Sequence, residues 1–137
     1  MHPASAIIFT CIDWRLHPRV EEFLRDKYGS FDLCATAGSV KGFTDPKIRA
    51  YFLEQIMISK QLHNIKKAVL TIHSDCGAYG GSAAFANARE EIVRHTSALL
   101  EIKSIVKERF PRLKIELYFI DLTLRRRQWI PVLRQVR

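Results

Sequence analysis

The chain has 137 residues, of which 47% are hydrophobic and 26% are charged, as in an ordinary globular domain. No apolar run is long enough for a signal peptide or a membrane span. Its three cysteines, an odd number without the spacing of a disulfide framework, argue against a secreted fold. We therefore expect a single domain over residues 1–137 that is cytoplasmic and makes no membrane contact.

The formal net charge of +8 is concentrated near the end of the chain. The last thirteen residues contain no acid and five arginines, namely Arg125, Arg126, Arg127, Arg134 and Arg137. A basic segment of this kind can bind phosphate or nucleic acid. A solvated or subunit-pairing helix is the more common structure, and we favour it here.

Apolar runs alternate with helical patterns along the chain. Pro18 opens the first predicted helix, Gly29 closes it, and Pro46 lies in the first turn of the second. A recurring apolar face that includes Ile92 and Leu99 predicts the third helix. In chain order, we predict a strand at residues 6–10, a helix at 18–28, a strand at 31–36, a helix at 45–62, a strand at 67–73, a helix at 82–110, a strand at 114–120 and a short helix at 129–136.

Strands that alternate with helices indicate an α/β fold. We expect a mostly parallel sheet of four to five strands, in the order 2-1-3-4, with helices on both faces. In such sheets, ligands bind beyond the carboxyl ends of the strands, where the strand order reverses. The most reactive side chains of this sequence lie at that edge.

Two strand ends carry a possible metal site. Cys11, Asp13 and Arg15 follow the first strand at every second position, so in extended chain they project to one side. His73 ends the third strand, and Cys76 follows three residues later. If these strands are neighbours, two thiolates and an imidazole converge, which is a natural set of Zn²⁺ ligands. Three protein ligands with an open fourth position are typical of a catalytic zinc site.

The acid and the arginine then acquire roles beside that open position. Asp13 can either bind the metal or accept a hydrogen bond from metal-bound water, and Arg15 can hold it away from the metal through a bidentate ion pair. Zinc lowers the pKa of its bound water to about 7, which supplies hydroxide at neutral pH. We therefore expect hydroxide attack on a small electrophile.

These motifs resemble those of the β-class carbonic anhydrases. The resemblance rests on Cys-x-Asp-x-Arg at Cys11, followed about sixty residues later by His-x-x-Cys-Gly at His73. It extends over residues 7–81, and the segment Ala37-Gly38-Ser39 falls where that family usually has Ala-Gly-Asn.

The resemblance implies a zinc enzyme that interconverts CO₂ and bicarbonate. It also implies a homodimer or a higher homo-oligomer, because that family is built from dimers. Residue by residue, it implies zinc ligands at Cys11, His73 and Cys76, a catalytic dyad of Asp13 and Arg15, and a contact from the backbone N–H of Gly77 to bicarbonate.

Other interpretations stay open at this point. Trp14 and Ser39 depart from the family pattern, so a related zinc hydrolase acting on COS or CS₂ is an alternative. A catalytically silent zinc-stabilised module that binds nucleic acid through its arginine-rich end is another. We expect Cys34 in the core, Asp75 as a turn residue or hydrogen-bond acceptor, Trp14 and Tyr79 as pocket or packing residues, and His17, His63 and His95 at the surface.

Overall fold

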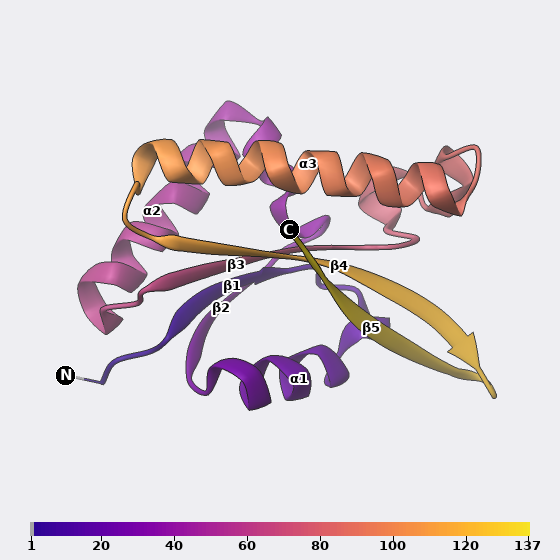
Figure 1. Cartoon of the computed structure of the whole chain (residues 1–137), viewed down its shortest axis with the longest axis horizontal. Helices are drawn as coiled ribbons and strands as arrows, with labels where there is room; N and C mark the ends of the chain where they lie inside the picture. Colours follow the sequence, from indigo (N-terminus) through magenta and orange to yellow (C-terminus); the bar gives the residue numbers. More distant parts are fainter. Residues whose placement is uncertain (1) are drawn as a thin grey trace.

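The computed structural model describes residues 2–137 and contains one five-stranded sheet with helices on both faces (Figure 1). The strand order is β2-β1-β3-β4-β5. The strands are β1 (Ala6–Thr10), β2 (Phe31–Ala35), β3 (Lys67–His73), β4 (Lys114–Arg125) and β5 (Gln128–Val136). The helices are α1 (Arg19–Tyr28), α2 (Pro46–His63) and α3 (Ala88–Arg109), with four short 3₁₀ turns in the loops.

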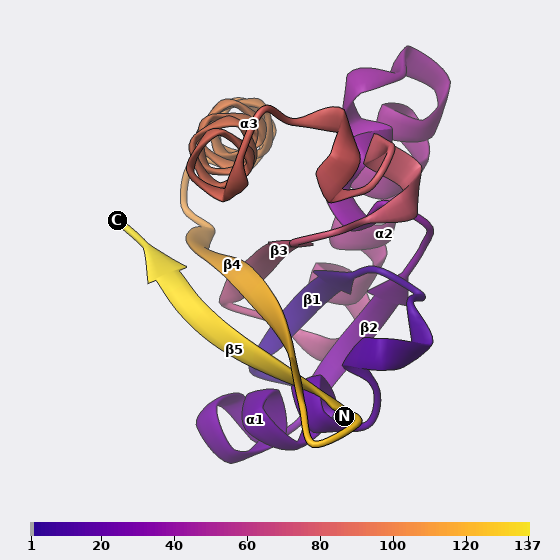
Figure 2. The same cartoon turned by 90° about the vertical axis from the view of Figure 1, so that its right-hand side faces the viewer.

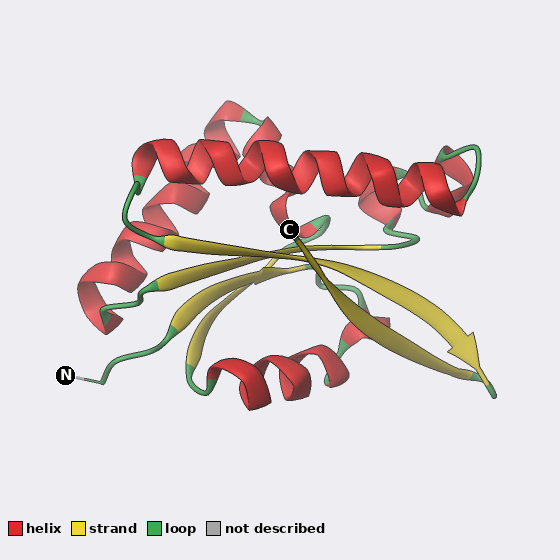
Figure 3. Cartoon of the chain, in the orientation of Figure 1, coloured by secondary structure: helices red, strands yellow, loops and turns green. Residues whose placement is uncertain are grey.

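The predicted fold class and strand order are confirmed. Strands β1 to β4 are parallel, in the order 2-1-3-4, and β5 is added antiparallel to β4. Helix α1 covers one face of the sheet, and α2 and α3 cover the other (Figures 2 and 3). This arrangement follows from the alternation of strands and helices, because each crossover between parallel strands places a helix on a face.

Strand β1 lies in the middle of the sheet, and all five of its residues are buried. Ile8 pairs with Leu33 of β2 on one side and with Val69 of β3 on the other. Alternate residues of β1 contribute to two cores, since Phe9 packs with α2 and α3 while Ile8 packs with α1. Burial on both faces explains why this strand is an unbroken apolar run.

The predicted helix at residues 129–136 is wrong, because this segment is strand β5. It pairs antiparallel with β4 along a register that runs from Leu117 opposite Val136 to Arg125 opposite Gln128. Strand β4 also extends beyond the predicted end at residue 120. Its edge away from β3 supplies hydrogen-bond partners to the backbone of residues 129–136, which a short isolated segment would lack. Pro131 is tolerated there because β5 is an edge strand.

The arginine-rich segment is therefore a hairpin turn and not a helix. Arg125 ends β4, and Arg126 and Arg127 form the turn with φ of +49° and +64°. These three side chains are exposed at the tip of the β4–β5 hairpin. The surface position expected for them is confirmed, although the helical structure is not.

The third helix is shorter than predicted. It begins at Ala88, where the Asn87 side chain accepts a hydrogen bond from the N–H of Glu90 at 2.9 Å, and residues 82–84 form a 3₁₀ turn instead. It runs without a break to Arg109. None of the helices in residues 2–137 combines the length and apolar character that crossing a lipid bilayer requires.

Candidate metal centre

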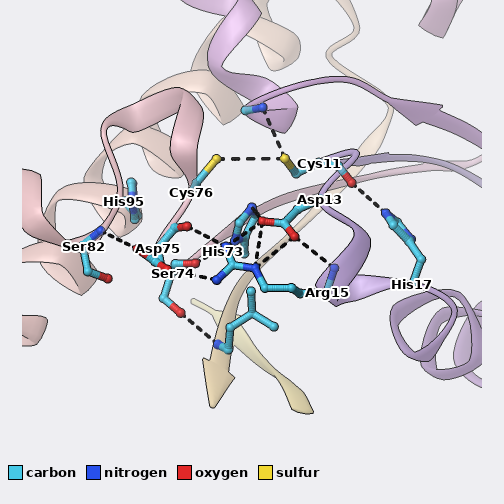
Figure 4. Close-up of polar contacts among 12 residues, drawn as sticks. Cys11, Asp13, Arg15, His17, His73, Ser74, Asp75, Cys76, Ser82 and His95 are labelled. Atoms are coloured by element: carbon cyan, nitrogen blue, oxygen red, sulfur yellow. Dashed lines mark hydrogen bonds and ion pairs between the residues drawn. The ribbon is translucent and has the colours of Figure 1, made fainter. Parts of the chain in front are cut away.

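Cys11, His73 and Cys76 converge at the carboxyl ends of β1 and β3 (Figure 4). Cys11 follows β1 directly, His73 is the last residue of β3, and Cys76 follows a short turn. Because β1 and β3 are hydrogen-bonded neighbours, the ligand atoms of the three side chains all lie within 4.8 Å of one another. The two sulfur atoms are 4.0 Å apart, and all three residues are buried. The predicted convergence is confirmed.

One ring nitrogen of His73 is hydrogen-bonded and the other has no hydrogen-bond partner among residues 2–137. Nδ1 lies 2.6 Å from the carbonyl oxygen of Ser74, to which it can only donate, so in the neutral ring that binds a metal Nε2 carries the lone pair. Nε2 is buried and has no hydrogen-bond partner among residues 2–137. A buried polar atom left in this way is costly, whereas an imidazole held by a backbone carbonyl is the usual form of a zinc-ligating histidine. The residues therefore fit a zinc ion.

The two thiols are poised to share one cation. A hydrogen bond from Cys76 holds the pKa of Cys11 down at about 3, with further support from His73 and from backbone N–H groups. The same contact raises the pKa of Cys76, because its ionisation would place a second negative charge beside the first. A divalent cation removes that repulsion, so the pair is suited to bind one as two thiolates.

The loop between β2 and α2 supports Cys11. The backbone N–H of Gly38 donates a hydrogen bond to the Cys11 sulfur at 3.4 Å. Gly38 has φ of +78°, and a Cβ at this position would lie 2.9 Å from Cβ of Ala78. Only glycine therefore allows the backbone to approach this closely. Ser39 follows with φ of +54°, a region in which asparagine is better tolerated than serine.

Asp13 and Arg15 form a bidentate ion pair beside the three ligands. Nε and Nη2 of Arg15 donate to the Asp13 carboxylate at 3.0 and 2.6 Å, and the backbone N–H of Arg15 donates to it at 2.9 Å. Hydrogen bonding from Arg15 holds the pKa of Asp13 below its usual range, so the carboxylate is charged at neutral pH. Oδ2 of Asp13 lies 3.8 Å from Nε2 of His73. The dyad therefore borders the candidate metal position.

Asp75 holds the other side of the Arg15 guanidinium. Nη1 of Arg15 donates to the Asp75 carboxylate at 2.9 Å, and Nη2 donates to its backbone carbonyl at 2.8 Å. The N–H of Ser82, and then Arg15, lower the pKa of Asp75. Asp75 has φ of +54°, so it is both the turn residue and the hydrogen-bond acceptor that the sequence suggested.

The comparisons with known proteins agree with this geometry. A family model described as "Putative carbonic anhydrase" matches residues 1–129. The chain belongs to this carbonic anhydrase family. An uncharacterized protein of Rickettsia conorii is 27% identical over 130 residues, which cover 89% of this chain and 70% of that protein.

Two solved carbonic anhydrases share the fold of this family member. The enzyme of Streptococcus mutans aligns with a TM-score of 0.59 and 22% identity, over 99% of this chain and 84% of that one. The enzyme of Glaciozyma antarctica aligns with a TM-score of 0.60 and 16% identity, over 96% and 83% of the two chains. At these identities, the similarity establishes a common fold.

In this carbonic anhydrase-like chain, an open cavity of about 800 Å³ lies over the cysteines and the dyad. Gly77 and Trp14 line it, and Trp14 is 74% exposed, so its ring forms part of the rim and does not fill the cavity. Tyr79 does not line this cavity; it packs edge-on against the His95 ring with the ring centroids 4.8 Å apart. Trp14 is therefore a pocket residue and Tyr79 a packing residue.

The surface position predicted for three histidines holds only in part. His95 is buried, with 2% of its surface exposed, and burial lowers its pKa, so this prediction is wrong. His17 is half-buried, and its Nε2 lies 2.9 Å from the Cys11 carbonyl oxygen. His63 pairs with Asp32 at 2.8 Å. Helical periodicity indicates that a residue lies on an inward face, but it does not show how deeply that face is covered.

Cys34 is half-buried and packs against the core under α2 and α3, as expected. Burial raises the pKa of its thiol, which makes it a poor ligand at neutral pH.

Glu91 supports the site and was missed by sequence reasoning. Glu91 on α3 is buried, and its carboxylate accepts hydrogen bonds from the N–H of Asp75 at 2.9 Å and from the Ser82 hydroxyl at 2.9 Å. It thereby ties the loop that carries Cys76 to the helix. An acid on the inward face of an amphipathic helix was the available signal.

Proposed function

We propose that this protein is a zinc enzyme that catalyses the reversible hydration of CO₂ to bicarbonate. The observation that carries the proposal is the buried cluster of Cys11, His73 and Cys76, in which Nε2 of His73 has no protein partner among the described residues. Membership of the carbonic anhydrase family supports the same reaction. A zinc ion held by these ligands would lower the pKa of a water molecule and so supply hydroxide to attack CO₂.

The protein groups around the ligands would orient the reactants. The ionised carboxylate of Asp13 is an acceptor without a proton of its own, so it can accept a hydrogen bond from the nucleophile and fix its direction. Arg15 neutralises Asp13 and holds both of its oxygens, which keeps the carboxylate beside the metal position and not on it.

The cavity would receive the substrate. Gly77 lies on its wall, and its backbone N–H is our candidate donor to an oxygen of bicarbonate. A Cβ at Gly77 would meet no atom within 4 Å, so the cavity is open at this point. CO₂ has no charge and no hydrogen-bond donor, so an open cavity beside the nucleophile is sufficient to admit it.

The decisive experiment compares metal content and CO₂ hydration in four proteins. We expect the purified protein to bind about one zinc per chain, and Cys76→Ser to lose zinc and activity together. Asp13→Asn should retain zinc and lose most of its turnover, because an amide cannot replace the carboxylate acceptor. Cys34→Ser is the matched control, since Cys34 lies outside the cluster, and it should retain both properties.

Each outcome of that experiment has a defined meaning. Less than about half an equivalent of zinc in the wild-type protein would overturn the metal site. Unchanged hydration by Asp13→Asn would overturn the role of the dyad. Zinc-loaded protein that hydrolyses COS or CS₂ but does not hydrate CO₂ would replace the proposed substrate with the alternative one.

We further propose that the protein is a homodimer formed across β2 and α2. In the part of the chain that the structure describes, β2 pairs with β1 alone, so its other edge is free. Beside it, Leu33 of β2 and Tyr51, Ile58 and Leu62 of α2 are 37–60% exposed and border a cleft of about 410 Å³. A second copy related by a two-fold axis would cover this apolar surface and the free edge together.

A further inference from the structure

The indole of Trp129 lies against the guanidinium of Arg15. Trp129 belongs to β5, and Cζ of Arg15 is 4.8 Å from the centroid of its ring. We propose that Trp129 is a positioning residue, which fixes the Asp13–Arg15 dyad through a cation–π contact with Arg15. The proposal rests on the proposed function, because it assigns to Trp129 a part in the same reaction.

The hydrogen bonds of Arg15 restrain only the edge of the guanidinium. Nε and Nη2 donate to Asp13, and Nη1 donates to Asp75. Guanidinium N–H groups lie in the plane of the group, so these bonds fix its position within the plane but resist tilting of the plane only weakly. An aromatic ring against one face blocks that tilt. Trp129 therefore supplies a restraint that neither acid can provide.

The environment of Arg15 and Trp129 strengthens their cation–π contact. The Arg15 side chain is only 14% exposed, so little water competes for its charge. Tryptophan has the most favourable ring for a cation, and the attraction grows as the cation is desolvated. Trp129 is itself half-buried and packs against the core under α1, and this packing limits the movement of its ring.

The orientation of Arg15 matters because it decides where Asp13 lies. Oδ2 of Asp13 is 3.8 Å from Nε2 of His73, so a carboxylate released by Arg15 needs only a small shift to approach the metal position. If the guanidinium were less restrained, Asp13 could move to the metal position and would then no longer accept a hydrogen bond from the nucleophile. We expect removal of the Trp129 ring to lower kcat/KM about tenfold.

The β4–β5 hairpin is thus part of the site and not only an edge of the sheet. Trp129 lies two residues beyond the hairpin turn and pairs with Leu124, and its ring lies over Arg15 in the 3₁₀ turn at residues 14–16. The residues in contact are 114 positions apart in the sequence, from Arg15 to Trp129.

The experiment uses three variants and two readouts. Trp129→Leu removes the ring, Trp129→Phe keeps an aromatic face, and Leu133→Ala is the matched control. Leu133 lies on the same strand and packs against the same core as Trp129, but it has no π face. The first readout is the solvent exchange rate of the Arg15 Nε–H, measured by ¹⁵N NMR on metal-free protein. The second is kcat/KM for CO₂ hydration by the zinc-loaded protein.

We expect Trp129→Leu to accelerate exchange of the Arg15 Nε–H at least tenfold and to lower kcat/KM about tenfold. Trp129→Phe should restore most of both values, and Leu133→Ala should leave both within about twofold of the wild-type protein. If Trp129→Leu does not fold, a fluorinated tryptophan in a Trp14→Phe background tests the same contact. Fluorine weakens the negative face of the ring with little change of volume, so exchange should again accelerate.

The two readouts separate the failure of this proposal from the failure of the proposed function. Unchanged Nε–H exchange in Trp129→Leu, or an equal acceleration in Leu133→Ala, overturns the cation–π restraint whatever the activity. Faster exchange with kcat/KM unchanged overturns the positioning role. Absence of CO₂ hydration in the wild-type protein overturns the proposed function, while the NMR comparison still decides whether the ring restrains Arg15.

Discussion

Gly38→Ala provides a sharp test of how the loop after β2 supports the candidate metal centre. The backbone at Gly38 has φ of +78° and ψ of +5°, and its N–H donates to the Cys11 sulfur. An alanine there would place Cβ 2.9 Å from Cβ of Ala78 and 3.1 Å from Cβ of Lys41. Ala78 cannot swing away as a long side chain can, so the two loops must separate.

Gly80 offers a matched control, because it has nearly the same backbone conformation. Its φ is +88° and its ψ is +7°, while an added Cβ would have one close neighbour, Cβ of Ala84 at 3.1 Å. Alanine in the left-handed region costs about 1–2 kcal/mol, offset by about 0.4–1 kcal/mol from the less flexible unfolded chain. Gly80→Ala should therefore lose about 1 kcal/mol of unfolding free energy.

Gly38→Ala carries the same backbone cost and an added steric cost of about 1–3 kcal/mol. We expect a total loss of about 3 kcal/mol, measured by urea unfolding of the metal-free protein. Disturbing a group that hydrogen-bonds a ligand lowers metal affinity about 10–100-fold. Since each tenfold change in affinity is about 1.4 kcal/mol, zinc should stabilise Gly38→Ala by about 1.4–2.8 kcal/mol less than it stabilises the wild-type protein.

The reasoning would be refuted by either of two results. Equal losses of unfolding free energy in Gly38→Ala and Gly80→Ala would show that the contact with Ala78 relaxes without cost. An undiminished stabilisation of Gly38→Ala by zinc would show that the loop does not support the cysteine.

Two further predictions concern the dyad and the proposed dimer. Because Arg15 lowers the pKa of Asp13 in the folded protein, the unfolded chain binds more protons in acid. The stabilisation is therefore complete above the ordinary carboxyl pKa of about 3.9 and is lost as the pH falls through the lower folded value. Metal-free wild-type protein should lose unfolding free energy more steeply than Asp13→Asn as the pH falls from about 5 to 3, and parallel curves would contradict the ion pair. Leu62→Glu should convert the dimer to a monomer in light scattering while Leu100→Glu, at an exposed position of α3, should not; a dimer that survives Leu62→Glu would place the interface elsewhere.

Local sequence was sufficient to predict the central strands and to single out the candidate ligands. Residues 6–9 are a short apolar run rich in β-branched and aromatic side chains, a pattern that favours a buried strand. Cys11, Asp13 and Arg15 do lie together, but the extended chain assumed for them is wrong, because β1 ends at Thr10 and residues 14–16 form a 3₁₀ turn. This turn lets the backbone N–H and the guanidinium of Arg15 donate to the Asp13 carboxylate. The strand order then brings His73 and Cys76 to Cys11, because neighbouring parallel strands end at the same edge.

Residues 129–136 show what local pattern left undecided. The segment is short, and its polar and apolar residues suit either a helix or an edge strand. The free edge of β4 decides the matter, because it satisfies backbone groups of β5 that would otherwise face water or remain unpaired. A hydrogen-bonding partner of this kind is a property of the assembled sheet and leaves no signal in the segment itself.

The sequence by itself thus indicated the parallel sheet and the two motifs that carry Cys11, His73 and Cys76, because these depend on patterns within short stretches of chain. Their convergence required β1 and β3 to be neighbours in the folded sheet. Only the tertiary structure decided that β5 is a strand, that His95 is buried, that Glu91 braces the loop of Cys76 and that Trp129 lies on Arg15. These features depend on contacts between residues far apart in the chain, and the free energy of such a contact exists only once the fold has brought its partners together.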